Sequence, residues 1–270
     1  MRDDAAIAFI GGGQMAIALA DGFRRAGLVD ARSMIVAEPD PQARERFADR
    51  LPGVRFAPGA EAAAAADLVI LAVKPQQATA ACGEFAGRLA HSAVLVSIVA
   101  GLSTKALERL AGTNRIIRVM PNTPCLVGKG VSAVCHTPAV QPEAVRRVVD
   151  LLMAVGTVHE VDESLLDAVT GVSGSGPGYI AMITEALTTG GIQAGLPEPL
   201  ALALAVETLA GTAALLEQTG DHPAEIRKRV CSPGGTTLAG LAAMETAGVA
   251  RGIAAGVVAA RDRARELGKG

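Results

Sequence analysis

The sequence has 270 residues, half of them apolar and 19% charged, which is enough to bury the cores of two domains. Its formal net charge of −2 provides no basic surface, so we expect neither nucleic acid nor an anionic membrane as a partner. The four cysteines show neither C-x-x-C pairing nor histidines at metal-ligand spacing, so we expect no metal; they are Cys82, Cys125, Cys135 and Cys231.

Two features bear on the cellular compartment. The N-terminal residues lead straight into an apolar strand and leave no room for a signal peptide, and unpaired thiols are typical of a reducing cytoplasm. The apolar segment 200–216 carries Glu207 and is slightly short for the roughly 20 residues of a membrane span, so we predict a buried helix there. We therefore expect a cytoplasmic protein.

The first part of the chain alternates short apolar strands with helices. The predicted strands are 6–10, 34–37, 68–73, 94–99 and 116–119, and the predicted helices are 14–26, 41–51 and 103–111. Runs as apolar as Leu68–Val73 are typical of parallel strands that are buried on both faces. The alternation predicts an α/β domain over 1–162, with a doubly wound parallel sheet of the Rossmann type.

The remainder, 163–270, reads as helices separated by Gly, Pro and Ser, with no convincing strand. The predicted helices are 164–172, 178–190, 198–218, 223–231, 236–246 and 249–266. They carry more apolar surface than about a hundred residues can bury on themselves. We therefore predict an all-helical dimerisation domain that forms an obligate homodimer through intertwined helices.

The first strand ends in the pattern Gly11-x-Gly13-x-x-Ala16, which opens a helix. Gly11 permits a tight turn, Gly13 lets backbone N–H groups approach a pyrophosphate, and the helix N-terminus adds partial positive charge. This context favours dinucleotide binding over a glycine-rich turn without a ligand. The residues expected to contact the dinucleotide here are Ile10, Gly11, Gly12, Gly13, Gln14 and Met15.

Glu38 ends the second predicted strand, 22 positions after Ala16 (38 − 16). An acidic side chain there usually accepts hydrogen bonds from the adenine-ribose hydroxyls and repels a 2′-phosphate. Arg44 and Arg46 on the next helix could soften that repulsion, although a solvated helix face is the simpler interpretation. The expected cofactor is NADPH and/or NADH, and Glu38 favours NADH.

Two more loops follow the third and fourth strands, where open α/β sheets bind ligands. Both loops are expected to line the binding site of the nicotinamide ribose. The first loop contains Ala72, Val73, Lys74 and Pro75, and the second contains Val99, Ala100 and Gly101. Lys74 could be catalytic, as an ammonium beside a reacting carbonyl or imine, or a ribose donor, or a solvated strand-end lysine. The rigid turn 120–124 could place Asn122 and Thr123 in the same cleft.

The helical part contains two loops that are denser in glycine than helix capping requires. Segments 173–178 and 232–237 each begin a helix, so their N–H groups could cradle an anion. With no metal cluster and no Ser-His-Asp spacing, they point to a small anionic substrate that is reduced by hydride.

Along essentially its whole length the chain resembles pyrroline-5-carboxylate reductase. The glycine loop at 9–16 is common to many reductases, but Ser173–Tyr179 and Ser232–Thr237 in this order and spacing are specific. The blocks 72–75, 120–124 and 167–171 also match. The resemblance implies that NAD(P)H reduces a cyclic imine carboxylate to proline, and that dimers often assemble into larger rings.

The resemblance also implies site roles. The expected substrate-binding residues are Glu163, Ser175, Ser232, Gly234, Gly235, Thr236 and Thr237, with the Thr237 hydroxyl reaching the ring nitrogen; Thr237 and Lys74 are the catalytic candidates. This sequence departs from the family at Glu38, where NADPH-using relatives often have a small hydroxyl residue. It also departs at Ala60, Arg229 and Cys231.

Two other functions remain open. A 3-hydroxyacid dehydrogenase would want a catalytic lysine on a helix of the second domain, where Lys228 is the only interior candidate. A dinucleotide sensor or scaffold would need neither glycine-rich loop of the helical part.

Overall fold

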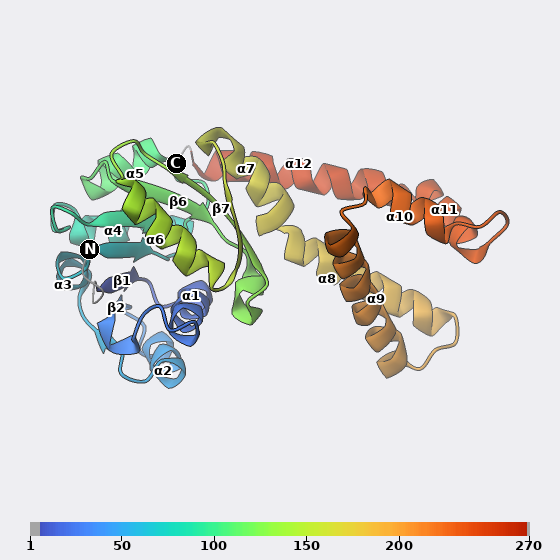
Figure 1. Cartoon of the computed structure of the whole chain (residues 1–270), viewed down its shortest axis with the longest axis horizontal. Helices are drawn as coiled ribbons and strands as arrows, with labels where there is room; N and C mark the ends of the chain where they lie inside the picture. Colours follow the sequence, from blue (N-terminus) through green and yellow to red (C-terminus); the bar gives the residue numbers. More distant parts are fainter. Residues whose placement is uncertain (1–5, 269–270) are drawn as a thin grey trace. The chain divides into compact units, whose positions relative to one another are not determined.

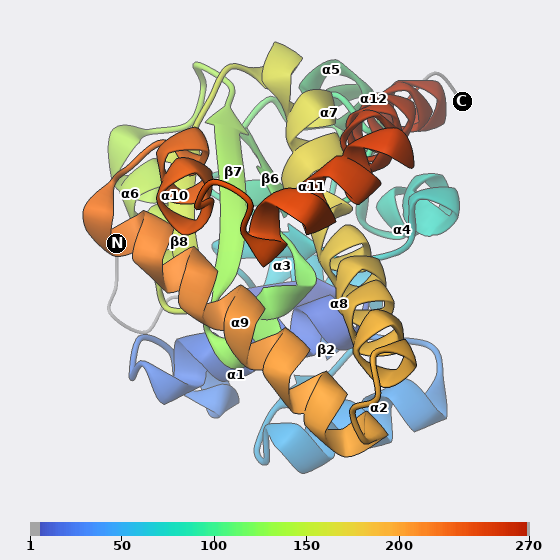
Figure 2. The ribbon, with the colours of Figure 1, turned by 90° about the vertical axis from the view of Figure 1, so that its right-hand side faces the viewer.

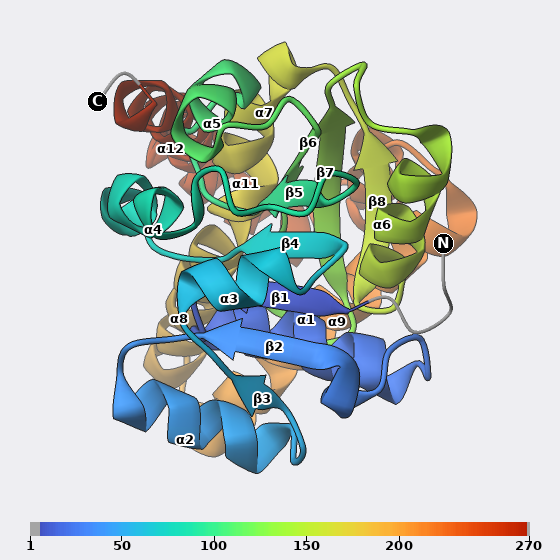
Figure 3. The ribbon, with the colours of Figure 1, turned by 90° about the vertical axis from the view of Figure 1, so that its left-hand side faces the viewer.

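The computed structural model describes residues 6–268, and an eight-stranded sheet forms its first part (Figures 1 and 3). The order across the sheet is β3-β2-β1-β4-β5-β6-β7-β8, which contains the 3-2-1-4-5-6 order of a doubly wound fold. The strands are β1 (Ile7–Ile10), β2 (Met34–Ala37), β3 (Arg55–Phe56), β4 (Leu68–Leu71), β5 (Val94–Ser97), β6 (Ile116–Met120), β7 (Gly130–His136) and β8 (Gly156–Glu160).

Neighbouring strands run parallel except β6 and β7, which pair antiparallel with Arg118 opposite Cys135. Ile10 of β1 pairs with Ala37 of β2 and with Leu71 of β4, so these strands end level at one edge. The predicted doubly wound sheet is confirmed. β3, β7 and β8 lie outside the predicted strands, and β7 and β8 run antiparallel to the other six strands.

Helices cover both faces of the sheet. On one face, Phe9 of β1 lies beside Phe23 and Phe47, with ring centroids 6.5 and 6.1 Å away. On the other face, Phe85 and Leu107 pack into a second buried cluster. The helices of this part are α1 (Gln14–Arg25), α2 (Pro41–Arg50), α3 (Gly59–Ala64), α4 (Ala78–Phe85), α5 (Thr104–Ala111), α6 (Pro142–Met153) and α7 (Leu166–Val169).

The rest of the described chain is helical, as predicted, and Figure 2 shows these helices. α8 and α9 pack side by side as a hairpin, and Gly220 in a left-handed conformation ends α9. The helices are α8 (Gly176–Gln193), α9 (Glu198–Thr219), α10 (Pro223–Val230), α11 (Thr236–Thr246) and α12 (Val249–Leu267).

The chain divides into two compact units. Residues up to Ser175, together with those from Ala259 onward, form one unit, and Gly176–Val258 form the other. This division differs from the predicted boundary between 162 and 163 for a physical reason. Leu166 of α7 packs on Ala133 and Cys135 of β7, so α7 belongs with the sheet.

α9 corrects the expectation of a buried helix. The single chain buries Ala201 and Ala205 of α9 but leaves its large apolar side chains open; Leu200, Leu202, Leu204, Val206 and Leu215 are 44–50% exposed. Within residues 6–268, α9 is the one single helix long and apolar enough to cross a membrane, and the bent pair α11–α12 passes the same test jointly. Core helices pass it too, and this apolar surface is what a second subunit would bury.

Candidate functional site

The turn from β1 to α1 lies at the carboxyl edge of the sheet. Gly11 has a φ of +99°, and a Cβ there would lie 2.7 Å from the carbonyl oxygen of Ala72, so glycine is required. Gly13 is the N-cap of α1, and no side chain caps this helix or adds negative charge to its first turn. The N-terminus of α1 is therefore open to an anionic group such as a pyrophosphate.

Glu38 lies directly against this glycine loop. Its Oε2 accepts a hydrogen bond from the Gly12 N–H at 2.7 Å, and its Oε1 accepts one from the Asp40 N–H at 3.0 Å. The Arg44 Nε donates to the carbonyl oxygen of Glu38 and not to its carboxylate, while Arg46 lies 3.9 Å from Asp40. The structure thus places one full negative charge beside the loop, with Arg44 held against the main chain.

The loops after β4 and β5 reach the same edge. The Ala72 N–H donates to the carbonyl oxygen of Ile10 at 2.8 Å, and the Ile98 N–H donates to that of Leu71 at 3.1 Å. Lys74 is exposed, and its backbone N–H donates to Gln77 Oε1 at 3.3 Å. The predicted dinucleotide contacts therefore come together at one edge of the sheet, while the catalytic role of Lys74 stays a prediction.

In the helical unit, the predicted substrate loop ends at the start of α11. Gly234 has a φ of +69°, and the Gly235 N–H donates to the carbonyl oxygen of Ser232 at 2.9 Å. Gly235 is the N-cap, with no side-chain cap and no acidic residue in the first turn. Within the described chain, Thr237 makes no side-chain hydrogen bond, so amides and a hydroxyl are available together at this helix start.

The segment around Ser175 is a correction. Residues Thr170–Gly174 form a π-helical turn that continues α7, and the Ser175 N–H donates to the carbonyl oxygen of Thr170 at 2.8 Å. Because this amide is already used inside the helical stack, the prediction of an open cradle at Ser175 is wrong for its backbone. Glycine density marked a π turn here, a feature that often accompanies functional sites.

Asn122 is a second correction, because its side chain is buried and occupied. Its Nδ2 lies 3.2 Å from the carbonyl oxygen and 3.3 Å from the hydroxyl of Ser173, and its Oδ1 accepts from the Val131 N–H at 2.8 Å. Asn122 braces the turn after β6 against the π-helical turn, and both ends of its side-chain amide have partners within the chain.

Glu163 is held by residues that sequence reasoning missed. Its Oε1 accepts from the Thr104 N–H and from Arg118 Nη1, both at 2.6 Å, and its Oε2 accepts from the Thr104 hydroxyl at 2.6 Å. Partial burial opposes ionisation of this carboxyl, but these hydrogen bonds outweigh it and hold its pKa below the usual range. Arg118 was detectable in principle, because a charge inside the apolar strand 116–119 requires a buried partner.

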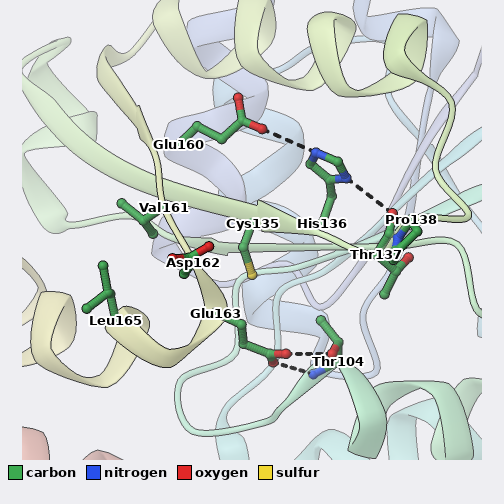
Figure 4. A pocket seen from close by; sticks show the side chains of 10 residues that line it. All are labelled: Thr104, Cys135, His136, Thr137, Pro138, Glu160, Val161, Asp162, Glu163 and Leu165. Atoms are coloured by element: carbon green, nitrogen blue, oxygen red, sulfur yellow. Dashed lines mark hydrogen bonds and ion pairs between the residues drawn. The ribbon is translucent and has the colours of Figure 1, made fainter.

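Figure 4 shows Glu163 and Thr104 at one side of an open pocket over β7 and β8. His136 and Glu160 form a second pair there, with 3.2 Å between Nε2 and Oε1. The lining contains none of the glycine-loop residues. Glu163 therefore belongs to the sheet unit, whereas the Ser232–Thr237 loop belongs to the helical unit.

Comparisons with known proteins cover the whole chain. Residues 163–267 match the family model of pyrroline-5-carboxylate reductase dimerisation, and residues 6–101 match a model described as NADP oxidoreductase, coenzyme F420-dependent. A pyrroline-5-carboxylate reductase from Synechocystis sp. is 42% identical over 264 residues, which cover 97% of this chain and 98% of that protein.

Solved structures agree. A pyrroline carboxylate reductase from Plasmodium falciparum with NADP bound is 28% identical and superposes with a TM-score of 0.90, covering 99% of this chain and 100% of that one. A pyrroline-5-carboxylate reductase from Coxiella burnetii is 31% identical with a TM-score of 0.87, covering 97% and 98%.

Proposed function

This chain belongs to the pyrroline-5-carboxylate reductase family, and we propose that it transfers a hydride from NADH or NADPH to the imine carbon of 1-pyrroline-5-carboxylate. The product is L-proline, so the reaction is the last step of proline biosynthesis. The observation that carries this proposal is the 42% identity to the Synechocystis sp. reductase over 97% of the chain. The open N-termini of α1 and α11 support it, because dinucleotide and substrate are both anions.

The chemistry needs positioning more than acid strength. Hydride attacks the imine carbon far more readily once the ring nitrogen is protonated. The amides of Thr236 and Thr237 at the start of α11 bind the substrate carboxylate, and the Thr237 hydroxyl hydrogen-bonds the nitrogen. A threonine hydroxyl is too weak an acid to protonate the imine, so the proton comes from water or is already present. The nicotinamide supplies the hydride.

Replacing Thr237 with alanine tests this arrangement. A hydrogen bond to a charged group contributes about 1.5–3 kcal/mol, so Thr237→Ala should lower kcat/KM for pyrroline-5-carboxylate by roughly 10- to 100-fold. Thr246→Ala is the matched control, because its hydroxyl bonds only the Ala242 carbonyl at the far end of the same helix. An inactive wild-type protein would contradict the whole proposal, whereas an unchanged Thr237→Ala variant would contradict only the role of Thr237.

We further propose that NADH is preferred. Glu38 lies against Gly12, where an adenine ribose meets the loop in doubly wound folds, and a 2′-phosphate would meet its charge. Two unit charges about 5 Å apart at an effective dielectric constant of about 20 repel by roughly 3 kcal/mol. Because water and Arg44 screen part of that repulsion, we expect a preference of about 10- to 100-fold.

The ratio of kcat/KM with NADH to that with NADPH measures this preference. Glu38→Gln should shift the ratio toward NADPH by about 10-fold or more, because it removes the charge and keeps the size. Asp40→Asn is the control, since Asp40 is a neighbouring acid whose capping bond to the Gln42 N–H can be kept by asparagine. A wild-type protein with a strong preference for NADPH would refute the role of Glu38.

The helical region matches a dimerisation model, and the chain is a homodimer through this region. The apolar side chains of α9 that the single chain leaves open support this. Assembly of dimers into a larger ring is a proposal, which sedimentation equilibrium tests: a species no larger than two subunits would refute it.

A cytoplasmic location is likewise proposed, since Cys82, Cys125 and Cys135 are buried free thiols. Fractionation of cells tests this location, and recovery of the protein outside the cytoplasm would refute it.

A further inference from the structure

The Glu163 carboxylate joins three elements of the sheet unit. It accepts two hydrogen bonds from Thr104, the first residue of α5, and it pairs with Arg118 of β6. The Arg118 side chain is only 9% exposed, and this carboxylate compensates its buried charge. Glu163 itself begins the short 3-10 helix Glu163–Leu165 that precedes α7. Figure 4 shows the carboxylate turned onto Thr104.

Thr104 ends the loop that follows β5, and this loop contains Val99, Ala100 and Gly101. The loop is held at its other points as well. The Val99 N–H donates to Ser97 Oγ at 3.3 Å. Gly101 has a φ of +84°, and a Cβ there would lie 3.0 Å from the Ala264 carbonyl oxygen in the last turn of α12. The two Thr104 bonds to Glu163 attach the C-terminal end of the loop to the sheet unit.

The three hydrogen bonds leave the Glu163 carboxylate little capacity for a substrate. Both oxygens already accept from Thr104, and Oε1 also faces the guanidinium of Arg118. The negative charge lies at the N-terminus of α5, where the helix dipole stabilises it. A carboxylate in this position fixes the start of α5 relative to the sheet.

We propose that Glu163 is a positioning residue for the nicotinamide end of the cofactor, which acts by fixing the Val99–Thr104 loop through Thr104, and that it is not a substrate ligand. The proposal rests on the proposed function in one respect, namely that this loop walls the nicotinamide ribose. It assigns to Thr104 and Arg118 a part in cofactor binding. Neither residue needs to touch the cofactor for this.

Dissociation constants of NADH, measured without any imine, test the proposal on the full-length dimer. The chain has no Trp, so binding is followed by the emission of the reduced nicotinamide itself. Thr104→Val removes the hydroxyl bond and keeps the shape and the backbone bond, so we expect about a 3- to 10-fold weaker affinity. Glu163→Gln puts an amide beside Arg118, and we expect a loss of about 10-fold or more.

Three further variants test whether the loss of affinity depends on the linkage between Thr104 and Glu163. Thr104→Ser restores the hydroxyl and should bind NADH within about 2-fold of wild type. The double variant Glu163→Gln/Thr104→Val should be no weaker than Glu163→Gln alone, because both changes break one linkage. Thr113→Val repeats the threonine exchange at the opposite end of α5, where the hydroxyl accepts only from the Arg115 N–H, and should leave the affinity unchanged.

Steady-state kinetics separate the two roles of Glu163. Positioning predicts that KM for NADH rises and kcat falls while KM for pyrroline-5-carboxylate stays constant. A raised KM for the imine with unchanged NADH affinity would overturn the proposal in favour of a substrate ligand. Wild-type affinity for NADH in both variants, with only the melting temperature lowered, would also overturn it. Because NADH binding is measured without imine, failure of the proposed activity remains a separate result.

Discussion

A substitution at Asp21 tests how ion pairs between α1 and α2 stabilise the sheet unit. Asp21 lies on α1, its side chain is 4% exposed, and three arginines surround it. Arg24 and Arg25 lie 2.9 and 3.2 Å away on the same helix, and Arg50 at the end of α2 lies 2.7 Å away. Asp21 therefore ties the helix that opens at the glycine loop to the helix that follows Glu38.

The magnitude follows from this geometry. Breaking a buried ion pair costs about 3–5 kcal/mol when the remaining charge stays buried. The three arginine side chains are 42–56% exposed and can rehydrate, so the loss is closer to that of charge-assisted hydrogen bonds. We expect Asp21→Asn to lower the free energy of unfolding by about 2–3 kcal/mol at pH 7.

The effect should depend on pH in a defined direction. Burial opposes ionisation of the Asp21 carboxyl, but the hydrogen bonds from Arg24 and Arg50 outweigh it and lower its pKa below 3.8. The stabilisation is therefore fully present above the unfolded pKa of about 3.9 and is lost as the pH falls through the lower folded value. The difference between wild type and Asp21→Asn should shrink below about pH 4.

Urea unfolding followed by far-UV circular dichroism suits this chain, which has no Trp and one Tyr. Subunit concentration must be held constant, because the dimer contributes to stability. Asp30→Asn is the matched control, since Asp30 pairs with Arg32 at the exposed surface and its loss should leave the midpoint unchanged. Equal destabilisation by both variants, or an Asp21→Asn effect that is constant from pH 7 to pH 3, would refute the reasoning.

Two more predictions concern packing. Gly22→Ala should lower the free energy of unfolding by about 1–2 kcal/mol, because its Cβ would collide with the buried Val155 side chain, whereas Gly83→Ala, with open space around it in α4, should raise it slightly; equal urea midpoints would count against this packing. Iodoacetamide should alkylate at most one thiol of the native protein, that of half-buried Cys231, and all four thiols in urea. Burial shields the other three thiols and raises their pKa, to about 11 for Cys82 and Cys135. Mass spectrometry that finds Cys82, Cys125 or Cys135 modified in the native protein would contradict this prediction.

Local signals predicted α1, α2, α5 and the helices of the second part, whereas α4 and α6 lie outside the predicted helices. Asp40-Pro41 marks the start of α2 and Gly220 the end of α9, because the capping groups and turn residues lie in the sequence beside the helix they bound. β7 has no such local signal. It pairs antiparallel with β6, with Met120 opposite Ala133, so its strand conformation depends on tertiary pairing.

The site residues likewise differ in how far the sequence predicts them. The glycine loop and the start of α11 follow from local spacing, and the structure places both at open helix N-termini. Glu163 was predicted beside the substrate, yet it accepts from Thr104, 59 positions earlier in the chain. Ser175 was predicted in a loop because glycine-rich segments occur both in loops and in π-helical turns. The hydrogen bond from its N–H to the Thr170 carbonyl oxygen places it in the helical stack.

Transfer of deuterium tests the central claim most directly. NADH that carries deuterium at the transferable position of nicotinamide C4 is incubated with the protein and pyrroline-5-carboxylate, and the product is examined by mass spectrometry and NMR. The expected product is proline with one deuterium on the ring carbon that is bonded to nitrogen and does not bear the carboxylate. Absence of proline, or proline whose new hydrogen comes from water, would contradict it.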